Sequence, residues 1–162
     1  MVEPGSYWLL LILVVLVGGS AFFSASETAL TSLSKIRLRN MMEDKVRNAD
    51  KISRLVEHPG KLLSTILVGN NLVNICASSL ATYVAMSINP TAGVGIATIV
   101  MTIVILIFGE ITPKTVAAQN SEKISLKVAG LIGLLEFLFT PVIVVLNVVT
   151  SLIMRLFGVD LD

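Results

Sequence analysis

Two pairs of polar residues and one carboxylate lie within otherwise apolar stretches of this sequence. Ser20 and Ser24 are four residues apart, as are Asn70 and Asn74, so each pair shares one face of a helix. Glu110 follows an uncharged run of about sixteen residues. A carboxylate at the centre of a bilayer costs about 2.5–3.5 kcal/mol, so other groups must compensate for Glu110. We predict that the four polar side chains, together with a bound cation, do so.

The predicted ligands are all oxygen atoms, with no histidine or cysteine among them. Oxygen donors suit Mg²⁺, Ca²⁺, Mn²⁺ or Na⁺ and argue against Zn²⁺ and Cu. Mg²⁺ commonly uses one or two carboxylates per site, which fits the single Glu110. A plainer alternative stays open for each serine and asparagine, because such residues in membrane helices often only form hydrogen bonds between helices.

The composition indicates a membrane protein. The chain has 162 residues, of which 54% are hydrophobic and 14% charged, and its mean hydropathy is +0.87. Ordinary soluble domains carry about 25% charged residues. The length predicts a single domain over 1–162. The only cysteine, Cys76, cannot form an intramolecular disulfide, and we interpret it as a small core residue.

Three segments are long and apolar enough to span a bilayer, which needs about 20 helical residues. They are 8–33, 62–88 and 93–116, and each carries its polar residues in one half. Counting about 1.5 Å per residue from the ends of these spans places the serines, the asparagines and Glu110 at one depth, slightly inward of the midplane. Gly109 and Pro113 flank Glu110 and are expected to loosen the helix there. Irregular backbone at membrane depth is tolerated where it lines a protected site.

The basic residues predict the orientation of the chain. Eight Lys or Arg residues lie within 34–61, so this segment is expected to be cytoplasmic. The uncharged turn at 87–92 and the N-terminus are then outside, which predicts a multi-pass protein of the cell membrane. Apolar residues recur every three or four positions within 34–61, as in an amphipathic juxtamembrane helix. Such a helix lies on the membrane surface or, alternatively, against another domain.

The last third, 119–157, is expected to be a second cytoplasmic juxtamembrane segment. Pro141 separates two apolar stretches of about 12 residues, each roughly 18 Å long as a helix and too short to cross about 30 Å of bilayer. We therefore predict a hairpin of two short helices and a cytoplasmic C-terminus. The alternative is one kinked span, which would carry the C-terminus outside and place Glu136 in lipid. The predicted fold is an all-α integral membrane protein with three transmembrane helices, juxtamembrane amphipathic helices and this hairpin.

Three short sequences resemble the transmembrane domain of the CorC/CNNM family of magnesium transporters. They are "SAFFSASETAL" (20–30), "GNNLVN" (69–74) and "FGEITPK" (108–114), and their order and spacing are specific. The resemblance covers nearly the whole chain. It implies three transmembrane helices, an outside N-terminus, juxtamembrane helices, a homodimer and Na⁺-coupled Mg²⁺ export.

The resemblance also implies a set of Mg²⁺ ligands, with Na⁺ as the coupling ion. The ligands are Ser20, Ser24, Asn70, Asn74, the Gly109 carbonyl and the Glu110 carboxylate. Members of the family usually continue into a cytosolic pair of CBS domains that bind ATP. Because this sequence stops after "FGVDLD", we expect it to be the membrane-domain part of a longer protein.

Other functions compete with Mg²⁺ transport by alternating access. One is a small proton-coupled exporter of organic cations, with Glu110 as the titrating group. Another is a membrane anchor or sensor for cytosolic domains that transports nothing. We expect no enzyme, because the only histidine, His58, lies outside the spans, and no nucleic-acid partner.

Two further carboxylates are expected near the inner membrane surface. Glu27 is predicted to pair with Lys114, or alternatively to help form a Na⁺ site. Glu136 is expected at the headgroups or in the cytoplasm, beside Lys123 and Lys127.

Overall fold

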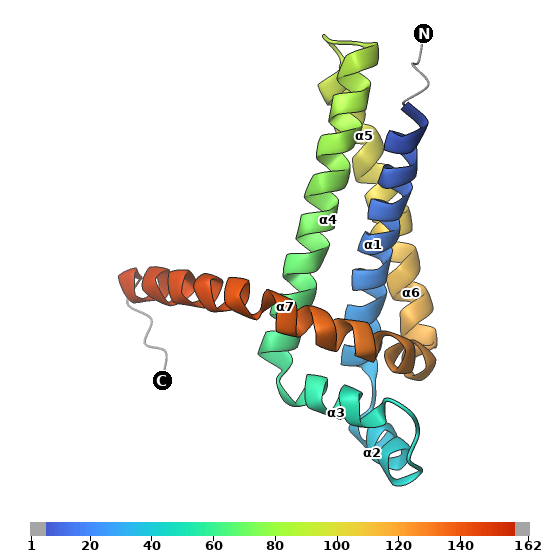
Figure 1. The fold of residues 1–162 in the computed structure, drawn as a ribbon, viewed down its shortest axis with the longest axis vertical. Helices are drawn as coiled ribbons and strands as arrows, with labels where there is room; N and C mark the ends of the chain where they lie inside the picture. Colours follow the sequence, from blue (N-terminus) through green and yellow to red (C-terminus); the bar gives the residue numbers. More distant parts are fainter. Residues whose placement is uncertain (1–5, 158–162) are drawn as a thin grey trace.

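The computed structural model describes residues 6–157, which form helices joined by short turns. Three long helical runs lie side by side, and the remaining helices gather at one end of them (Figure 1). This end carries α2 (Lys35–Glu43) and α3 (Ala49–Glu57), and we call it the basic end of the bundle. The long runs are α1 (Ser6–Ser32), α4 (Pro59–Ile88) and a third made of α5 (Gly93–Val104), η1 (Ile105–Ile111) and α6 (Thr112–Gln119).

The chain is a multi-pass membrane protein. Four helical stretches of the described residues are long and apolar enough to cross a membrane, whereas the sequence predicted three spans. The first three candidates overlap the ranges expected for those spans, and the fourth is the helix that follows them. The candidates are Tyr7–Ser32, Pro59–Ile88, Gly93–Gln119 and Ser121–Met154.

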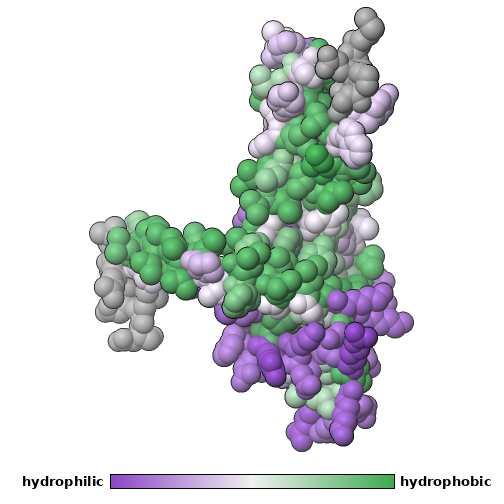
Figure 2. Space-filling model, in the orientation of Figure 1, coloured by the Kyte–Doolittle hydropathy of each residue, from purple (hydrophilic) through white to green (hydrophobic). Residues whose placement is uncertain are grey.

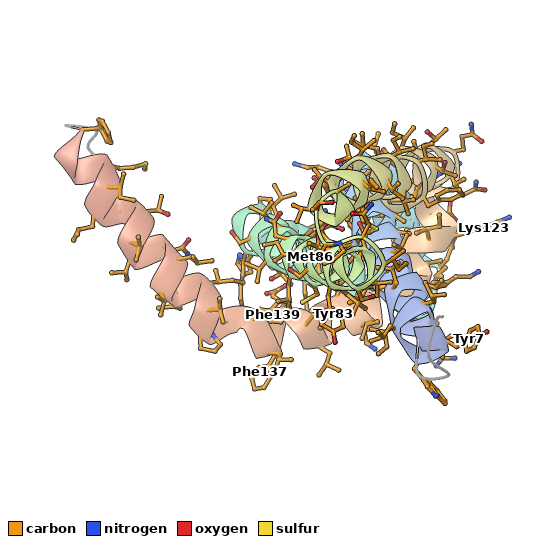
Figure 3. All side chains as sticks on the ribbon, turned by 90° about the horizontal axis from the view of Figure 1, so that it is seen from above. Tyr7, Tyr83, Met86, Lys123, Phe137 and Phe139 are labelled. Carbon is orange, nitrogen blue, oxygen red and sulfur yellow. The ribbon has the colours of Figure 1, made fainter. Side chains whose placement is uncertain are left out.

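The fourth candidate corrects the prediction of a C-terminal hairpin. Residues Ser121–Leu156 form a single helix, α7, with Pro141 inside it. A proline within a helix removes one hydrogen bond and commonly bends the helix instead of ending it. Figure 3 shows α7 changing direction near Phe137 and Phe139, just before the proline. The helix crosses the basic end of the bundle at a steep angle and then extends away from it (Figure 1).

α1 and α4 run antiparallel and approach closely where α4 carries a glycine. A β-carbon added to Gly69 would lie 2.2 Å from Cζ of Phe23, so the phenylalanine ring fits only against a glycine. A β-carbon added to Gly19 would lie 3.3 Å from Cγ1 of Val73. These two contacts fix the register of the two helices. Gly69 thus permits the close approach of the two helices.

The basic segment between α1 and α4 folds as two helices and not as one. Asn48, which precedes α3, has a left-handed backbone with φ 71°, and its side-chain amide donates to the Leu126 carbonyl at 3.0 Å. α3 buries Ala49, Ile52 and Leu55 on one face. This face is thereby held against the first half of α7.

The main hydrophobic core lies toward the basic end, where α1, α3, α4 and α7 meet. Leu30, Ile52 and Ile132 are its largest fully buried apolar side chains. On the face shown in Figure 2, hydrophilic residues cover the basic end, and hydrophobic residues cover most of the bundle above it and most of α7. Cys76 is exposed on α4, which corrects its interpretation as a core residue. The neighbouring Ala77 takes the buried position instead.

Candidate functional site

The three long helical runs meet at Ser20. The Ser20 hydroxyl donates a hydrogen bond to the Asn70 side-chain oxygen at 3.2 Å, which joins α1 to α4. A β-carbon added to Gly109 would lie 2.7 Å from Ser20 Oγ, so the η1 backbone packs directly against the same hydroxyl. Ser20 is fully buried. The structure thus brings together three of the six predicted ligand residues.

Two more of the predicted ligands carry buried oxygens without a partner. Ser24 Oγ and Asn74 Oδ1 form no hydrogen bond within the described part of the chain. An unsatisfied buried polar group costs about 1–3 kcal/mol and calls for an explanation, such as a water molecule or an ion. Both atoms belong to the pairs that the sequence singled out. Unpartnered oxygens of this kind are available to coordinate a cation.

The helix register sets the relative depth of these residues. Because the Gly19–Val73 and Gly69–Phe23 contacts pair the two antiparallel helices, Ser20 lies level with the stretch of α4 between Asn70 and Asn74. Ser24 lies four residues further along α1, about 6 Å nearer the basic end. The serines and asparagines therefore follow one another along the line where α1 packs against α4, which we call the seam. Ser20 is at its centre, and Ser24 is furthest from Asn74.

Glu110 lies in a stretch of π-helix, Ile105–Ile111, that interrupts the third helical run. The sequence predicted a loosened helix around Gly109 and Pro113, and the wider turn occurs there. π-helical turns are rare and are found frequently at functional sites. Glu110 is half-buried and takes part in none of the ion pairs among residues 6–157. Its carboxylate is therefore free to interact with a cation.

The predicted pairing of Glu27 with Lys114 is confirmed. Lys114 Nζ lies 3.2 Å from Glu27 Oε2, which joins α1 to α6. Glu27 is three residues beyond Ser24 on the same face of α1. It also lines a hollow of about 280 Å³ whose other polar residues are Ser64 and Asn70. This hollow connects the ion pair with the asparagine that contacts Ser20.

The sequence did not predict a group of hydroxyls that lies between α4 and α5, toward the end of the bundle opposite the basic end. A hollow of about 300 Å³ between α4 and α5 is lined by Ser78, Thr82, Thr98 and Thr102. The signal was present, since each helix carries two hydroxyl residues four positions apart. The three threonine hydroxyls donate to carbonyls of their own helices, which leaves their oxygen atoms able to accept.

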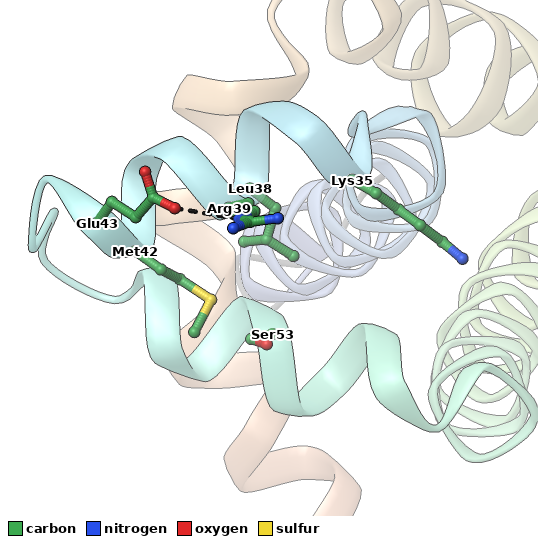
Figure 4. Close-up of a pocket in the computed structure, with 6 residues that line it drawn as sticks. All are labelled: Lys35, Leu38, Arg39, Met42, Glu43 and Ser53. Carbon is green, nitrogen blue, oxygen red and sulfur yellow. Dashed lines mark hydrogen bonds and ion pairs between the residues drawn. The ribbon is translucent and has the colours of Figure 1, made fainter.

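A third hollow, of about 440 Å³, lies between α2 and α3 and contains none of the predicted ligands. Leu38 and Met42 form its apolar side, and Lys35 and Arg39 its basic side (Figure 4). Arg39 already pairs with Glu43 at 3.0 Å. This hollow belongs to the basic end and not to the seam.

Glu136 has a partner other than the one expected. Its carboxylate lies 3.0 Å from Lys61 Nζ at the start of α4, so it is not neutralised by Lys123 or Lys127. His58, in the turn before α4, is exposed. Within residues 6–157, no three His, Cys, Asp or Glu side chains form a cluster that could hold a metal ion. A cation in this part of the chain would depend on neutral oxygens and single carboxylates.

Comparisons with known proteins agree with this architecture. Residues 11–162 match the family model of the cyclin M transmembrane N-terminal domain, CNNM. The chain is 43% identical, over 88% of its length, to the UPF0053 inner membrane protein YfjD of Escherichia coli and covers 33% of that protein. It is 45% identical, over 95% of its length, to a UPF0053 protein of Haemophilus influenzae and covers 37% of it.

A more distant relative carries a functional name. The chain is 27% identical to the polyamine export protein of Haemophilus influenzae, over 93% of its own length and 38% of the relative's. The chain thus spans about a third of the length of each of these three curated relatives. The match over residues 11–162 shows that this chain belongs to the CNNM family of membrane domains.

Proposed function

We propose that this chain is the membrane domain of a cation transporter whose substrate is Mg²⁺. The observation that carries the proposal is the pair of buried, unpartnered oxygens, Ser24 Oγ and Asn74 Oδ1, on either side of the Ser20–Asn70 hydrogen bond. Buried polar groups with a purely structural role normally have a hydrogen-bond partner, so buried oxygens without one favour a bound cation. The half-buried Glu110 supplies the negative charge.

The proposed ligands are five neutral oxygen donors and one charged carboxylate. The hydroxyls of Ser20 and Ser24, and the amide oxygens of Asn70 and Asn74, are neutral donors. The Gly109 carbonyl adds a neutral oxygen, and the Glu110 carboxylate is the only formal charge. Mg²⁺ dehydrates reluctantly and usually keeps several waters, so a single carboxylate is sufficient for a partly hydrated ion.

Alternating access is supported by hollows on both sides of the seam. The hollow lined by Glu27 and Asn70 reaches the seam from the basic end. The hydroxyl-lined hollow between α4 and α5 lies toward the opposite end. We propose that Mg²⁺ enters through the first and leaves through the second, and that Na⁺ is the coupling ion. Neither hollow is lined by Ser20 or Gly109, and we propose that the tight contact between these two residues is the barrier between the hollows.

The proposed orientation places the basic end in the cytoplasm. Eight basic residues lie within 34–61, and Figure 2 shows the hydrophilic surface gathered at this end. The three bundle helices are then the spans, and α7 lies along the inner surface, so the N-terminus is outside and the C-terminus cytoplasmic. A cysteine at Asn89 should react with an impermeant reagent from outside, and one at Asp50 only from inside. The reverse pattern would overturn this orientation.

A homodimer is also proposed. Asn71 is exposed on α4 although it lies in the middle of a span. An amide facing lipid is unfavourable, whereas an amide facing a second helix can form a hydrogen bond. A single monodisperse monomer in lipid nanodiscs would contradict the proposal. In longer relatives we further propose cytosolic CBS domains as partners of this membrane domain.

Isothermal titration of the purified chain with Mg²⁺ tests the proposed site. Glu110→Gln should reduce the affinity far more than Ser24→Ala or Asn74→Ala, because losing a charged partner costs several kcal/mol and a neutral ligand only about 1–3 kcal/mol. Glu57→Gln, at an exposed carboxylate of α3, is the matched control. Unchanged affinity in Glu110→Gln would place the site elsewhere.

A second function, export of an organic polycation, is supported by the relative named a polyamine export protein. The Glu110 carboxylate and the other proposed oxygen ligands could accept hydrogen bonds from an ammonium group as well as coordinate a metal ion. Flux into liposomes, measured separately for Mg²⁺ and for putrescine, distinguishes the two substrates. The absence of flux for both would favour a membrane anchor or sensor.

A further inference from the structure

A hollow of about 490 Å³ lies between α3 and α7, away from the six proposed ligands. Lys51, Arg54 and His58 line it on the side of α3, and Gly130 and Gly133 line it on α7. Positions 51 and 54 are three residues apart on α3, so their side chains share one face, and His58 follows directly after the helix. We propose that this hollow binds the phosphodiester headgroup of an anionic glycerophospholipid.

The charges around the hollow favour an anion. Neither Lys51 nor Arg54 takes part in the ion pairs formed within residues 6–157. Two carboxylates also line the hollow, but Glu136 is already neutralised by Lys61 at 3.0 Å. Glu57 is therefore the one lining carboxylate outside the described ion pairs. Two available cations against one carboxylate leave an excess of positive charge.

The two glycines leave room for the headgroup. A β-carbon added to Gly133 would meet no atom within 4 Å, and one added to Gly130 would meet only Lys51 Nζ, at 3.7 Å. Because no side chain fills this space, a phosphate can approach the α7 backbone and the Lys51 ammonium together. The glycines are thus not required by helix packing at these positions. They keep the hollow open.

The surroundings of the hollow favour a lipid over free phosphate. α7 exposes large apolar residues immediately beside the glycines, among them Leu131, Leu134 and Phe137, the last 79% exposed. Figure 2 shows this hydrophobic surface of α7 directly above the hydrophilic basic end. A headgroup in the hollow would leave its acyl chains against these residues. Basic pockets at the cytoplasmic edge of membrane helices recognise anionic headgroups in this way.

The occupant would join elements that are otherwise held by few polar contacts. α3 supplies the cations, α7 the glycines, and the Lys61–Glu136 pair beside them ties α7 to the start of α4. A bound headgroup therefore bridges the juxtamembrane helices at the base of the helix that carries Asn70 and Asn74. Binding should raise the thermal stability of the chain, since a ligand that binds only the folded state stabilises it.

Native mass spectrometry of the purified chain, titrated with phosphatidylglycerol, tests the proposal. We expect one tightly held lipid per chain and a loss of affinity on the order of tenfold or more in Lys51→Gln/Arg54→Gln. Gly133→Leu, which fills the hollow, should reduce the affinity as well. Lys45→Gln/Arg47→Gln removes the same charge from the exposed turn between α2 and α3 and should leave the affinity unchanged.

Three results would overturn the proposal. The first is equal phosphatidylglycerol affinity in the wild type and in Lys51→Gln/Arg54→Gln. The second is retention of phosphatidylcholine equal to that of phosphatidylglycerol, which would show that binding does not depend on the charge of the headgroup. The third is displacement of the lipid by millimolar inorganic phosphate, which would identify a site for a free anion. The comparison of the wild type with Lys51→Gln/Arg54→Gln tests the proposal even if Gly133→Leu folds poorly.

Discussion

The Ser20 hydroxyl donates to the Asn70 amide oxygen at 3.2 Å, and the backbone of Gly109 closes against the same hydroxyl. One small side chain thus touches both other helical runs of the bundle. Any group that enters this junction must displace the hydrogen bond. Any atom added there must push the helices apart.

Gly109→Ala should weaken Mg²⁺ binding. The new methyl group would lie 2.7 Å from Ser20 Oγ, closer than van der Waals contact allows, so either the serine or η1 must move. We expect a loss of affinity on the order of tenfold, because a misplacement of about 1 Å in a preorganised site is costly. Gly18→Ala, whose added carbon meets nothing within 4 Å, is the control. Equal binding by both variants in isothermal titration would contradict the prediction.

Gly69→Ala should lower the thermal stability of the chain. Its methyl group would overlap the Phe23 ring, 2.2 Å from Cζ, and overpacking of this kind costs about 1–3 kcal/mol. The added substitution Phe23→Leu should recover part of the loss by removing the ring. Gly95→Ala, at an open position on α5, is the matched control. A melting temperature in detergent equal to that of the control would show that the helices do not pack as described.

Lys114→Ala should raise the rate of Mg²⁺ binding at low salt and change stability little. The Lys114–Glu27 pair is partly exposed, and such pairs contribute about 0–1 kcal/mol. Its removal takes a positive charge from beside Glu27, which lines the hollow that leads to Asn70, and leaves Glu27 free to attract a cation. Glu27→Gln should have the opposite effect on the rate. Stopped-flow binding that responds identically to both substitutions would exclude this hollow as the entrance.

The parts of the fold that could be predicted are those set by local sequence. The three bundle helices follow from uninterrupted apolar stretches of sufficient length. The meeting of Ser20, Asn70 and Gly109 could be anticipated because membrane thickness forces helices to share one depth scale. The Glu27–Lys114 pair follows from the same counting. In each case the position of a residue along the membrane normal was enough for the prediction.

The parts that could not be predicted depend on which face of each helix is buried and on which helices pack against each other. Cys76 is exposed and Ala77 buried because α1 and α5 cover only part of α4, and sequence alone does not reveal which part. Glu136 pairs with Lys61, seventy-five positions away, because α7 crosses the start of α4. The hairpin prediction treated Pro141 as a terminator. A proline has this effect only if the chain gains packing by turning back, and α7 continues outward instead.

Pro141→Ala should straighten α7 without shortening it. The substitution restores one backbone hydrogen bond and removes the clash that bends the helix, so we expect unchanged or higher thermal stability and no loss of helix content. Spin labels at Leu131 and Val148, in a Cys76→Ser background, report the bend directly. Seventeen residues of straight helix span about 25 Å, so the label separation should lie below that in the parent chain and increase in Pro141→Ala. A hairpin would instead bring the labels close together in the parent chain, and the substitution would then abolish a defined short distance.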